Sequence, residues 1–317
     1  MKTLEIIIPV FNEEEVLTEL FLRLEKSLAP ELLQAAGVSG CRYLFVDDGS
    51  TDSTAALITA RIQDGMAAKL LRFSRNFGHQ NAVSAGLTHS TGDLVAVIDA
   101  DLQDPPELLP GMIQALNEGF DVVYGERAKR DAKWYMRICY WAFYRLLRLI
   151  SDVPVPVDAG DFCVMERRVV DAICNLPERL RFVRGLRSWV GFKQLAFPYS
   201  RPNRAAGESK YNLKSLYRLA TDGVASLSIR PLRITQAVLF FSLFITLFFL
   251  TIGLALFFSV NQQTEYGWWF LLTYLLIGFT SSLQIFCLYI IGAYVGRAYL
   301  EVKERPGFVI MEIINRD

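Results

Sequence analysis

The amino-acid sequence predicts an α/β fold with a mostly parallel, Rossmann-like sheet, followed by two C-terminal transmembrane helices. Two observations lead to this prediction. Apolar runs alternate with helical patterns over residues 4–125, and two long stretches without any charged residue lie between Arg233 and Arg297, separated by Glu265. Regular alternation of strands and helices favours parallel strands joined by right-handed crossovers. Each uncharged stretch exceeds the roughly 20 residues that cross the hydrocarbon core of a bilayer.

The elements of the predicted sheet follow one another at regular intervals. We expect strands at 4–10, 43–47, 70–74, 94–99 and 121–125, and helices at 13–28, after 52, after 78 and ending near 118. A sheet of this kind binds its ligands at the carboxyl ends of its strands. The polar residues that follow each strand are therefore the candidates for a functional site.

The two uncharged stretches, 237–260 and 268–295, are expected to span a membrane. The connector between them carries one Glu and no Lys or Arg, whereas Arg and Lys residues precede the first span and follow the second. The positive-inside rule therefore places both outer ends in the cytoplasm. The N-terminal residues do not form a signal-peptide pattern, which agrees with a cytoplasmic N-terminal domain. We expect this domain at 1–230, the membrane helices within 231–296 and a cytoplasmic tail at 297–317.

Two further segments have a composition that suits the membrane interface. Residues 133–150 are rich in aromatic residues and Leu, and the four basic residues Lys133, Arg137, Arg145 and Arg148 fall on one side of a helix. Such a helix either lies in the interface or packs on its own domain as an ordinary amphipathic helix. Residues 213–229 predict a second interfacial helix with a less distinct polar face.

Composition favours neither a nucleic-acid-binding protein nor a protein with a Cys metal site. Lys and Arg total 33, as do Asp and Glu, so the balance of charge does not favour a nucleic-acid partner. The five Cys residues have no spacing typical of metal ligands, which favours reduced thiols.

Carboxylates cluster after three of the predicted strands. The sequences PVFNE at 9–13, DDGS at 47–50 and DADLQ at 99–103 each place acidic side chains at a strand end. Two carboxylates on one short turn supply hard oxygen ligands that let Mg²⁺ or Mn²⁺ bridge to substrate phosphates. For Asp47 and Asp48 the alternative is turn chemistry followed by a capped helix. Three acidic strand ends at one edge of a sheet favour a shared site.

Together with SRNFG at 74–78 and the longer run DADLQDPPE at 99–107, these motifs resemble the family 2 glycosyltransferases, which have the GT-A fold. Three later motifs, GER at 125–127, DAGDF at 158–162 and GESKY at 207–211, resemble the polyprenyl-phosphate branch. That branch contains dolichyl-phosphate mannose synthases, bactoprenol glucosyltransferases and undecaprenyl-phosphate aminoarabinose transferases. The resemblance extends over nearly the whole chain.

The resemblance implies an enzyme that transfers a sugar from a nucleotide-sugar to a polyprenyl phosphate. Glucose from UDP-glucose and undecaprenyl phosphate are the first choices, with the catalytic domain on the cytoplasmic face of a bacterial inner membrane. GDP-mannose and a UDP-linked modified aminoarabinose remain alternative donors, and a homotetramer is expected. A processive polysaccharide synthase would need a Gln-x-x-Arg-Trp motif and more spans. A non-catalytic membrane scaffold would be expected to lack the metal ligands.

The same resemblance implies a role for individual residues. The nucleotide-sugar would contact Pro9, Phe11, Glu13, Val46, Asp48, Asp99, Ala100 and Asp101. Mg²⁺ or Mn²⁺ would bind to Asp99, Asp101 and Gln103, and the diphosphate and acceptor phosphate would bind to Arg127, Arg204 and Lys210. Asp101 and Asp161 are the candidate catalytic residues. Because the family often has Ser near Asp161, this carboxylate is interpreted either as a base or as an acceptor-orienting group.

The expected reaction is a single in-line displacement with inversion at the anomeric carbon. The acceptor is a phosphate monoester with a second pKa of about 6, so it is largely dianionic at neutral pH. A strong protein base is therefore not required. The larger requirement is to bring two anionic substrates together, which Arg, Lys and a divalent cation can meet.

Overall fold

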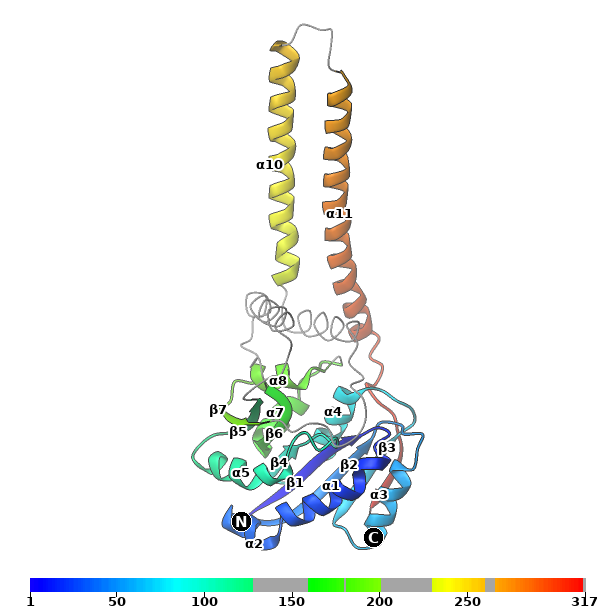
Figure 1. Ribbon diagram of the computed structural model, residues 1–317, viewed down its shortest axis with the longest axis vertical. Helices are drawn as coiled ribbons and strands as arrows, with labels where there is room; N and C mark the ends of the chain where they lie inside the picture. Colours follow the sequence, from blue (N-terminus) through cyan, green and yellow to red (C-terminus); the bar gives the residue numbers. More distant parts are fainter. Residues whose placement is uncertain (128–158, 180, 201–229, 260–265, 316–317) are drawn as a thin grey trace.

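The computed structural model describes residues 1–127, 159–179, 181–200, 230–259 and 266–315. These residues form a lower domain with a twisted sheet and a long helical hairpin that rises from it (Figure 1). The described strands make one sheet in the order β7-β5-β6-β4-β1-β2-β3-β8. Their bounds are β1 Lys2–Val10, β2 Val38–Asp47, β3 Ala68–Phe73, β4 Leu94–Val97, β5 Val122–Arg127, β6 Ala159–Glu166, β7 Gln194–Tyr199 and β8 Ile310–Asn315.

Helices cover both faces of this sheet because the central strands are apolar on both sides. The helices of the domain are α1 Glu14–Ser27, α2 Pro30–Ala35, α3 Thr54–Gln63, α4 His79–His89, the short 3-10 helix η1 Pro106–Leu108, α5 Leu109–Asn117, α7 Arg167–Cys174 and α8 Val183–Trp189. Ile6 and Ile8 of β1 pack with α1, α3 and α5, whereas Ile7 packs with α4, α7 and α8. A continuous apolar run such as that of β1 is typical of a parallel strand buried on both faces.

The sequence prediction of a mostly parallel α/β sheet is confirmed. β1 pairs in parallel with β2 and β4, and β2 pairs in parallel with β3. Two strands that were not predicted run in the opposite direction. β6 lies antiparallel between β4 and β5, and β8 pairs antiparallel with β3. The sheet therefore extends on both sides of the predicted strands.

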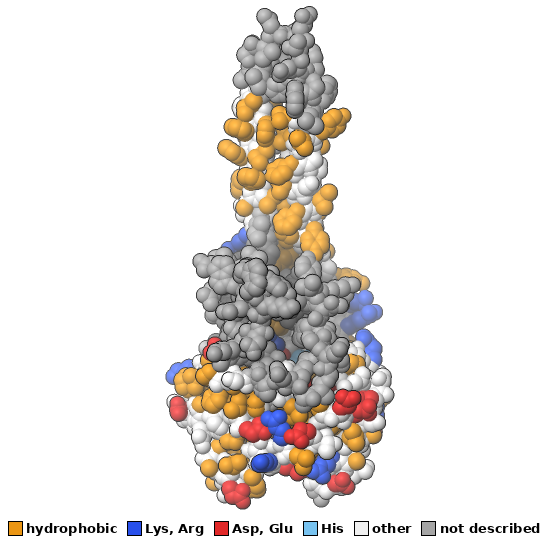
Figure 2. Space-filling view, viewed as in Figure 1, with side chains coloured by type: hydrophobic (Ala, Val, Ile, Leu, Met, Phe, Trp, Pro, Cys, Tyr) orange, Lys and Arg blue, Asp and Glu red, His pale blue; other side chains and the backbone are white. Residues whose placement is uncertain are grey.

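The helical hairpin consists of α10 Arg230–Ser259 and α11 Tyr266–Val302, which run side by side and contact each other. Its most apolar windows, Thr235–Ile252 and Leu272–Val302, are long enough to cross a membrane, and none of their residues is buried. Figure 2 shows apolar side chains over the described part of the hairpin, whereas charged side chains spread over the lower domain. The predicted helices are thus present, and their crossing of a membrane stays a prediction. The predicted interfacial helices at 133–150 and 213–229 lie outside the described residues.

Candidate functional site

The ends of β1 and β2 are joined by hydrogen bonds between their following loops. The backbone N–H of Asn12 donates to Ser50 Oγ over 3.0 Å, and the N–H of Thr51 donates to Asn12 Oδ1 over 2.9 Å. Asn12 has a φ of 54°, a left-handed conformation that Asn adopts more readily than most residues. The N–H of Glu13 donates to Thr54 Oγ1 over 2.9 Å. The two loops therefore form one rigid surface at the carboxyl edge of the sheet.

Asp48 and Gly49 fix a third loop, residues 74–78, against this surface. The Asp48 carboxylate accepts hydrogen bonds from the backbone N–H groups of Phe77 at 2.6 Å and Gly78 at 2.9 Å. Gly49 has a φ of 74°, and a Cβ at this position would lie 2.5 Å from the carbonyl carbon of Arg75. Burial raises the pKa of Asp48 above its ordinary value, and its hydrogen bonds to the backbone only partly offset that rise. Asp48 thus has a structural role beside the site, and its contact with a nucleoside stays a prediction.

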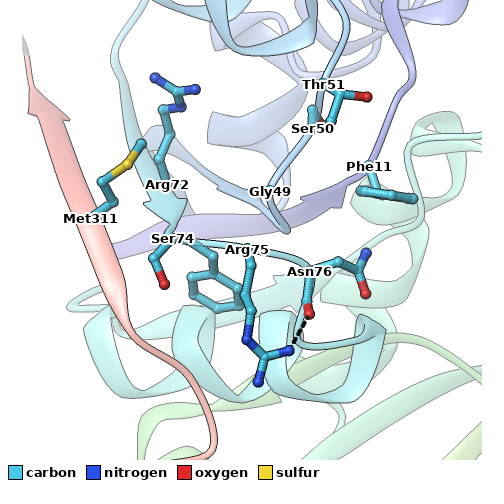
Figure 3. A pocket seen from close by; sticks show the side chains of 10 residues that line it. Phe11, Gly49, Ser50, Thr51, Arg72, Ser74, Arg75, Asn76 and Met311 are labelled. Carbon is cyan, nitrogen blue, oxygen red and sulfur yellow. Dashed lines mark hydrogen bonds between the residues drawn. The ribbon is translucent and has the colours of Figure 1, made fainter.

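A hollow of about 450 Å³ lies between these loops and the beginning of β8 (Figure 3). It combines backbone, hydroxyl and amide groups with a few apolar side chains and two Arg residues. Arg75 lies over the Phe77 ring at 4.1 Å and donates to the carbonyl of Asn76. The lining residues are Phe11, Gly49, Ser50, Thr51, Arg72, Phe73, Ser74, Arg75, Asn76 and Met311.

The Asp99–Asp101 turn follows β4 at the same edge of the sheet. The N–H of Gln103 donates to Asp101 Oδ1 over 3.1 Å, and the buried Leu102 between them has a φ of 59°. A residue other than glycine in the left-handed backbone conformation is strained, and such strain is frequent at functional sites. Asp99, Asp101 and Gln103 thus belong to one tight turn that the Asp101 side chain stabilises by its bond to the Gln103 backbone.

The donor set of this turn fits a divalent cation that also binds substrate. Within the described ranges no group of three His, Cys, Asp or Glu side chains is arranged to hold a metal ion. Two carboxylates and an amide oxygen nevertheless match Mg²⁺, which usually takes one or two carboxylates, several waters and substrate phosphates. The turn is therefore suited to a cation that is completed by a diphosphate.

A charged network lies next to this turn and centres on the buried Asp161. Arg184 Nε and Nη2 donate to its two carboxylate oxygens at 3.0 and 3.2 Å, and Gln80 Nε2 donates at 3.0 Å. His79 Nε2 lies 3.2 Å from Asp161 Oδ2 and 3.6 Å from Asp99 Oδ1. His79 thus connects the predicted metal turn with Asp161.

The charges of this network shift the pKa values of its members. Burial alone would raise the pKa of Asp161, but Arg184 and His79 hold that pKa well below its usual range. Desolvation acts to lower the pKa of His79. The hydrogen bond to Asp161 and the charges of Asp99 and Asp161 outweigh this effect and raise the pKa of His79 to about 9. At neutral pH the network therefore contains an ionised Asp161 and two cations.

The structure brings some of the predicted site residues together, and others lie outside the described part of the chain. Phe11 lines the hollow, and Asp99, Asp101 and Gln103 share one turn. Pro9 and Val46 are paired neighbours in the sheet, both buried, and Ala100 is buried as well. Arg127 is the last residue of β5, and its side chain lies outside the described part of the chain. Arg204 and Lys210 lie outside the described residues altogether.

Sequence reasoning did not single out several residues of this region, among them His79, Gln80, Arg184 and Met311. His79 and Gln80 directly follow the SRNFG motif at 74–78, so proximity to that motif was an available signal. Arg184 gave no such signal, because its contact with Asp161 depends on the position of α8 relative to β6.

Comparison with known proteins identifies the family. Residues 5–174 match the sequence model of the protein family glycosyl transferase family 2. The chain is 39% identical to the uncharacterised glycosyltransferase YkcC of Bacillus subtilis (strain 168), over 97% of this chain and 93% of YkcC. It is 34% identical to the prophage bactoprenol glucosyl transferase homolog of Escherichia coli (strain K12), over 98% and 99% of the two chains. The bactoprenol glucosyl transferase of Shigella phage SfII is also 34% identical, over 97% of each chain.

Among solved structures, the mannosyltransferase PcManGT from Pyrobaculum calidifontis in complex with GDP-Man and Mn²⁺ is similar, with a TM-score of 0.49 and 17% identity. That likeness covers 94% of this chain and 87% of PcManGT. The family match covers more than half of the chain, and the relatives at 34–39% identity cover almost all of it. The chain belongs to glycosyl transferase family 2, and it is a glycosyltransferase.

Proposed function

We propose that this enzyme transfers glucose from UDP-glucose to undecaprenyl phosphate at the cytoplasmic face of a bacterial inner membrane, with inversion at the anomeric carbon. One observation carries the proposal. The chain is 34% identical over nearly its full length to proteins named bactoprenol glucosyl transferase, and the similarity includes the helical hairpin. Their names specify both the lipid acceptor and the sugar.

The hollow and the Asp99–Asp101 turn are assigned to the donor. The nucleoside occupies the hollow beside Phe11, with Glu13 and Asp48 near it, and the diphosphate points along the sheet edge toward Asp101. Asp99, Asp101 and Gln103 are the residues that would hold Mg²⁺ or Mn²⁺. Such a cation neutralises the negative charge of the departing nucleoside diphosphate.

The acceptor side depends on cations and on Asp161. Arg127, Arg204 and Lys210 are proposed to bind the acceptor phosphate and the diphosphate. The low pKa of Asp161 makes it a weak base, and a dianionic phosphate does not need one. Of the two interpretations of Asp161, the orienting one is therefore favoured. Asp161 holds Arg184 and His79 in place, and these cations attract the acceptor phosphate toward the metal turn.

The hairpin is proposed to bring the catalytic domain to its lipid substrate. Over Thr235–Ile252 and Leu272–Val302, α10 and α11 expose apolar side chains, as helices in contact with lipid do. An enzyme with a soluble donor and a lipid acceptor must act at the interface, where the phosphate head group is accessible. Assembly as a homotetramer is proposed on the family resemblance alone.

A transfer assay with the full chain tests this function. Membranes containing the enzyme are incubated with undecaprenyl phosphate and, in turn, UDP-glucose, UDP-galactose, GDP-mannose and a UDP-linked modified aminoarabinose. We expect a glucosylated lipid only with UDP-glucose, loss of product with EDTA, and recovery on addition of Mg²⁺ or Mn²⁺. Transfer from another donor while UDP-glucose is inert would refute the donor assignment. Transfer to a soluble sugar but not to the lipid would refute the acceptor.

A further inference from the structure

The C-terminal residues form part of the sheet that carries the site. β8 follows the second apolar helix and pairs antiparallel with β3 at the sheet edge, with Leu70 opposite Ile314 and Arg72 opposite Glu312 (Figure 1). The pairing continues beyond β3, because the N–H of Ser74 donates to the carbonyl of Val309 over 3.0 Å. The segment expected to be a tail after the membrane helices is therefore the edge strand of the catalytic domain.

Side-chain contacts hold β8 in this register. Phe308 stacks on Phe73 with ring centroids 5.1 Å apart, and Arg72 Nη1 lies 3.3 Å from a carboxylate oxygen of Glu312. Ile310 and Ile314 pack against the hydrophobic clusters on opposite faces of the sheet. These contacts on both faces fix the position of every residue between Phe308 and Ile314.

A β-bulge in this pair changes the direction of one side chain. Arg72 and Phe73 are consecutive in β3, but they pair with Glu312 and Ile310, so Met311 is the extra residue of β8. A bulge re-aims a side chain, and bulges are frequent next to active sites. Met311 lines the hollow from the side opposite Phe11 (Figure 3), and 56% of Met311 is exposed.

We infer that Met311 is a donor-binding residue, whose thioether packs against the nucleobase of the nucleoside diphosphate donor. This inference rests on the proposed function, because it assigns the donor nucleoside to the hollow. The thioether is flexible and polarizable, and a sulfur beside an aromatic ring is a favourable contact. Phe11 supplies a second apolar wall across the hollow, while Ser50, Thr51 and Asn76 supply polar groups between them.

This assignment gives the strand after the membrane helix a function in substrate binding. Val302 ends α11 and Ile310 begins β8, so only a short connector separates the membrane helix from the wall of the hollow. A second contact strengthens the link, because Glu301 in the last turn of α11 accepts the backbone N–H of Arg179 over 2.9 Å. The donor pocket is thereby held at a fixed position relative to the helical hairpin.

The test compares Met311→Ala and Met311→Leu with Ile313→Ala in the purified full chain. Ile313 is a matched control because it lies on the same strand, is 46% exposed and is not among the residues that line the hollow. Isothermal titration with UDP and Mn²⁺ gives Kd, and steady-state transfer gives the KM values of both substrates. We expect Met311→Ala to raise the Kd for UDP and the KM for UDP-glucose roughly three- to tenfold, the size of one sulfur–aromatic contact.

For Met311→Ala, kcat and the KM for undecaprenyl phosphate should stay within about twofold of the wild type, which is a free-energy change of about 0.4 kcal/mol. All parameters of Ile313→Ala should stay within the same limit. Met311→Leu should lose less affinity than Met311→Ala, because it keeps the apolar volume. Equal donor affinity in Met311→Ala and wild type would overturn the inference and leave the proposed function intact. Failure of the wild type to bind any nucleoside diphosphate would refute both.

Discussion

The two halves of the candidate site are built by different kinds of interaction. On the side of the hollow, the loops after β1, β2 and β3 are held by hydrogen bonds to backbone groups and by the close approach at Gly49. On the side of α4, β6 and α8, the residues are held by ion pairs among His79, Asp161 and Arg184. The first half should respond mainly to changes in shape, and the second mainly to changes in charge.

The largest effect is expected at the turn that joins the two halves. Asp101→Asn keeps the shape of the side chain and removes its charge, so it should weaken cation binding and reduce the rate of transfer at least about 100-fold. The rate is measured with saturating UDP-glucose over a titration of Mn²⁺. The exposed Asp64 lies far from the site at the end of α3, and Asp64→Asn should retain wild-type activity. Full activity of Asp101→Asn would refute the metal role of this turn.

The next effect tests the charged half. Asp161→Ala removes a buried carboxylate together with its bonds to Gln80 and to the partly exposed Arg184 and His79, so it should lower the free energy of unfolding by about 3 kcal/mol. Chemical unfolding of the full chain in detergent, followed by circular dichroism, measures this change. The control is Asp171→Ala, which removes an exposed pair with Arg167 and should cost less than about 0.5 kcal/mol. Equal losses in the two variants would contradict the difference between a buried network and a surface pair.

The third effect tests the half that depends on shape. Gly49→Ala places a Cβ 2.5 Å from the backbone of Arg75 and adds the strain of a left-handed conformation, so the loops must separate. We expect a loss of roughly 2 kcal/mol in stability and a weaker affinity for UDP, measured by titration calorimetry. Gly119→Ala is the matched control, because its φ is 101° and no atom lies within 4 Å of the added Cβ. If both variants bind UDP equally well, the close approach at Gly49 does not shape the hollow.

The smallest effect is the dependence of stability on pH. Because the folded-state pKa of His79, about 9, lies above the value of 6.5 in the unfolded chain, its stabilising contribution is complete below pH 6.5. This contribution is lost as the pH rises through about 9. It should be on the order of 1 kcal/mol, since 44% of the His79 side chain is exposed and solvent screens its charge.

Unfolding of wild type and His79→Gln in EDTA from pH 6 to 10 measures this dependence. The difference in free energy of unfolding between the two proteins should shrink as the pH rises. A difference that is constant over this range would contradict the assigned charge of His79. The contribution of Asp161 to stability depends on pH in the opposite direction. Because its folded-state pKa is lowered, this contribution is lost only as the pH falls below about 4.

Local patterns in the sequence were sufficient to predict most of the sheet. The apolar runs of β1 to β5 and the polar residues at their ends identified the parallel core and the Asp99–Asp101 turn. β6 was not predicted, because its strand pattern was interpreted only as the motif around Asp161. β8 was not predicted either, because Ile310–Asn315 is short and its partner β3 lies some 240 residues earlier.

Contacts between distant segments account for what the sequence could not indicate about the site. The carboxylate of Asp48 is bonded to Phe77 and Gly78, and the ion pair of Asp161 joins α4 with α8 across β6. Neither contact follows from the residues near these Asp positions. In the same way, the position of Met311 depends on a bulge that only the paired strands define.

A crystal structure of the full chain with UDP-glucose and Mn²⁺ would show where the donor and the ion bind, since anomalous scattering locates the ion. We predict the ion at Asp99 and Asp101, the diphosphate bound to it, and the uracil in the hollow between Phe11 and Met311. An ion bound away from this turn, or a nucleoside outside the hollow, would contradict this prediction.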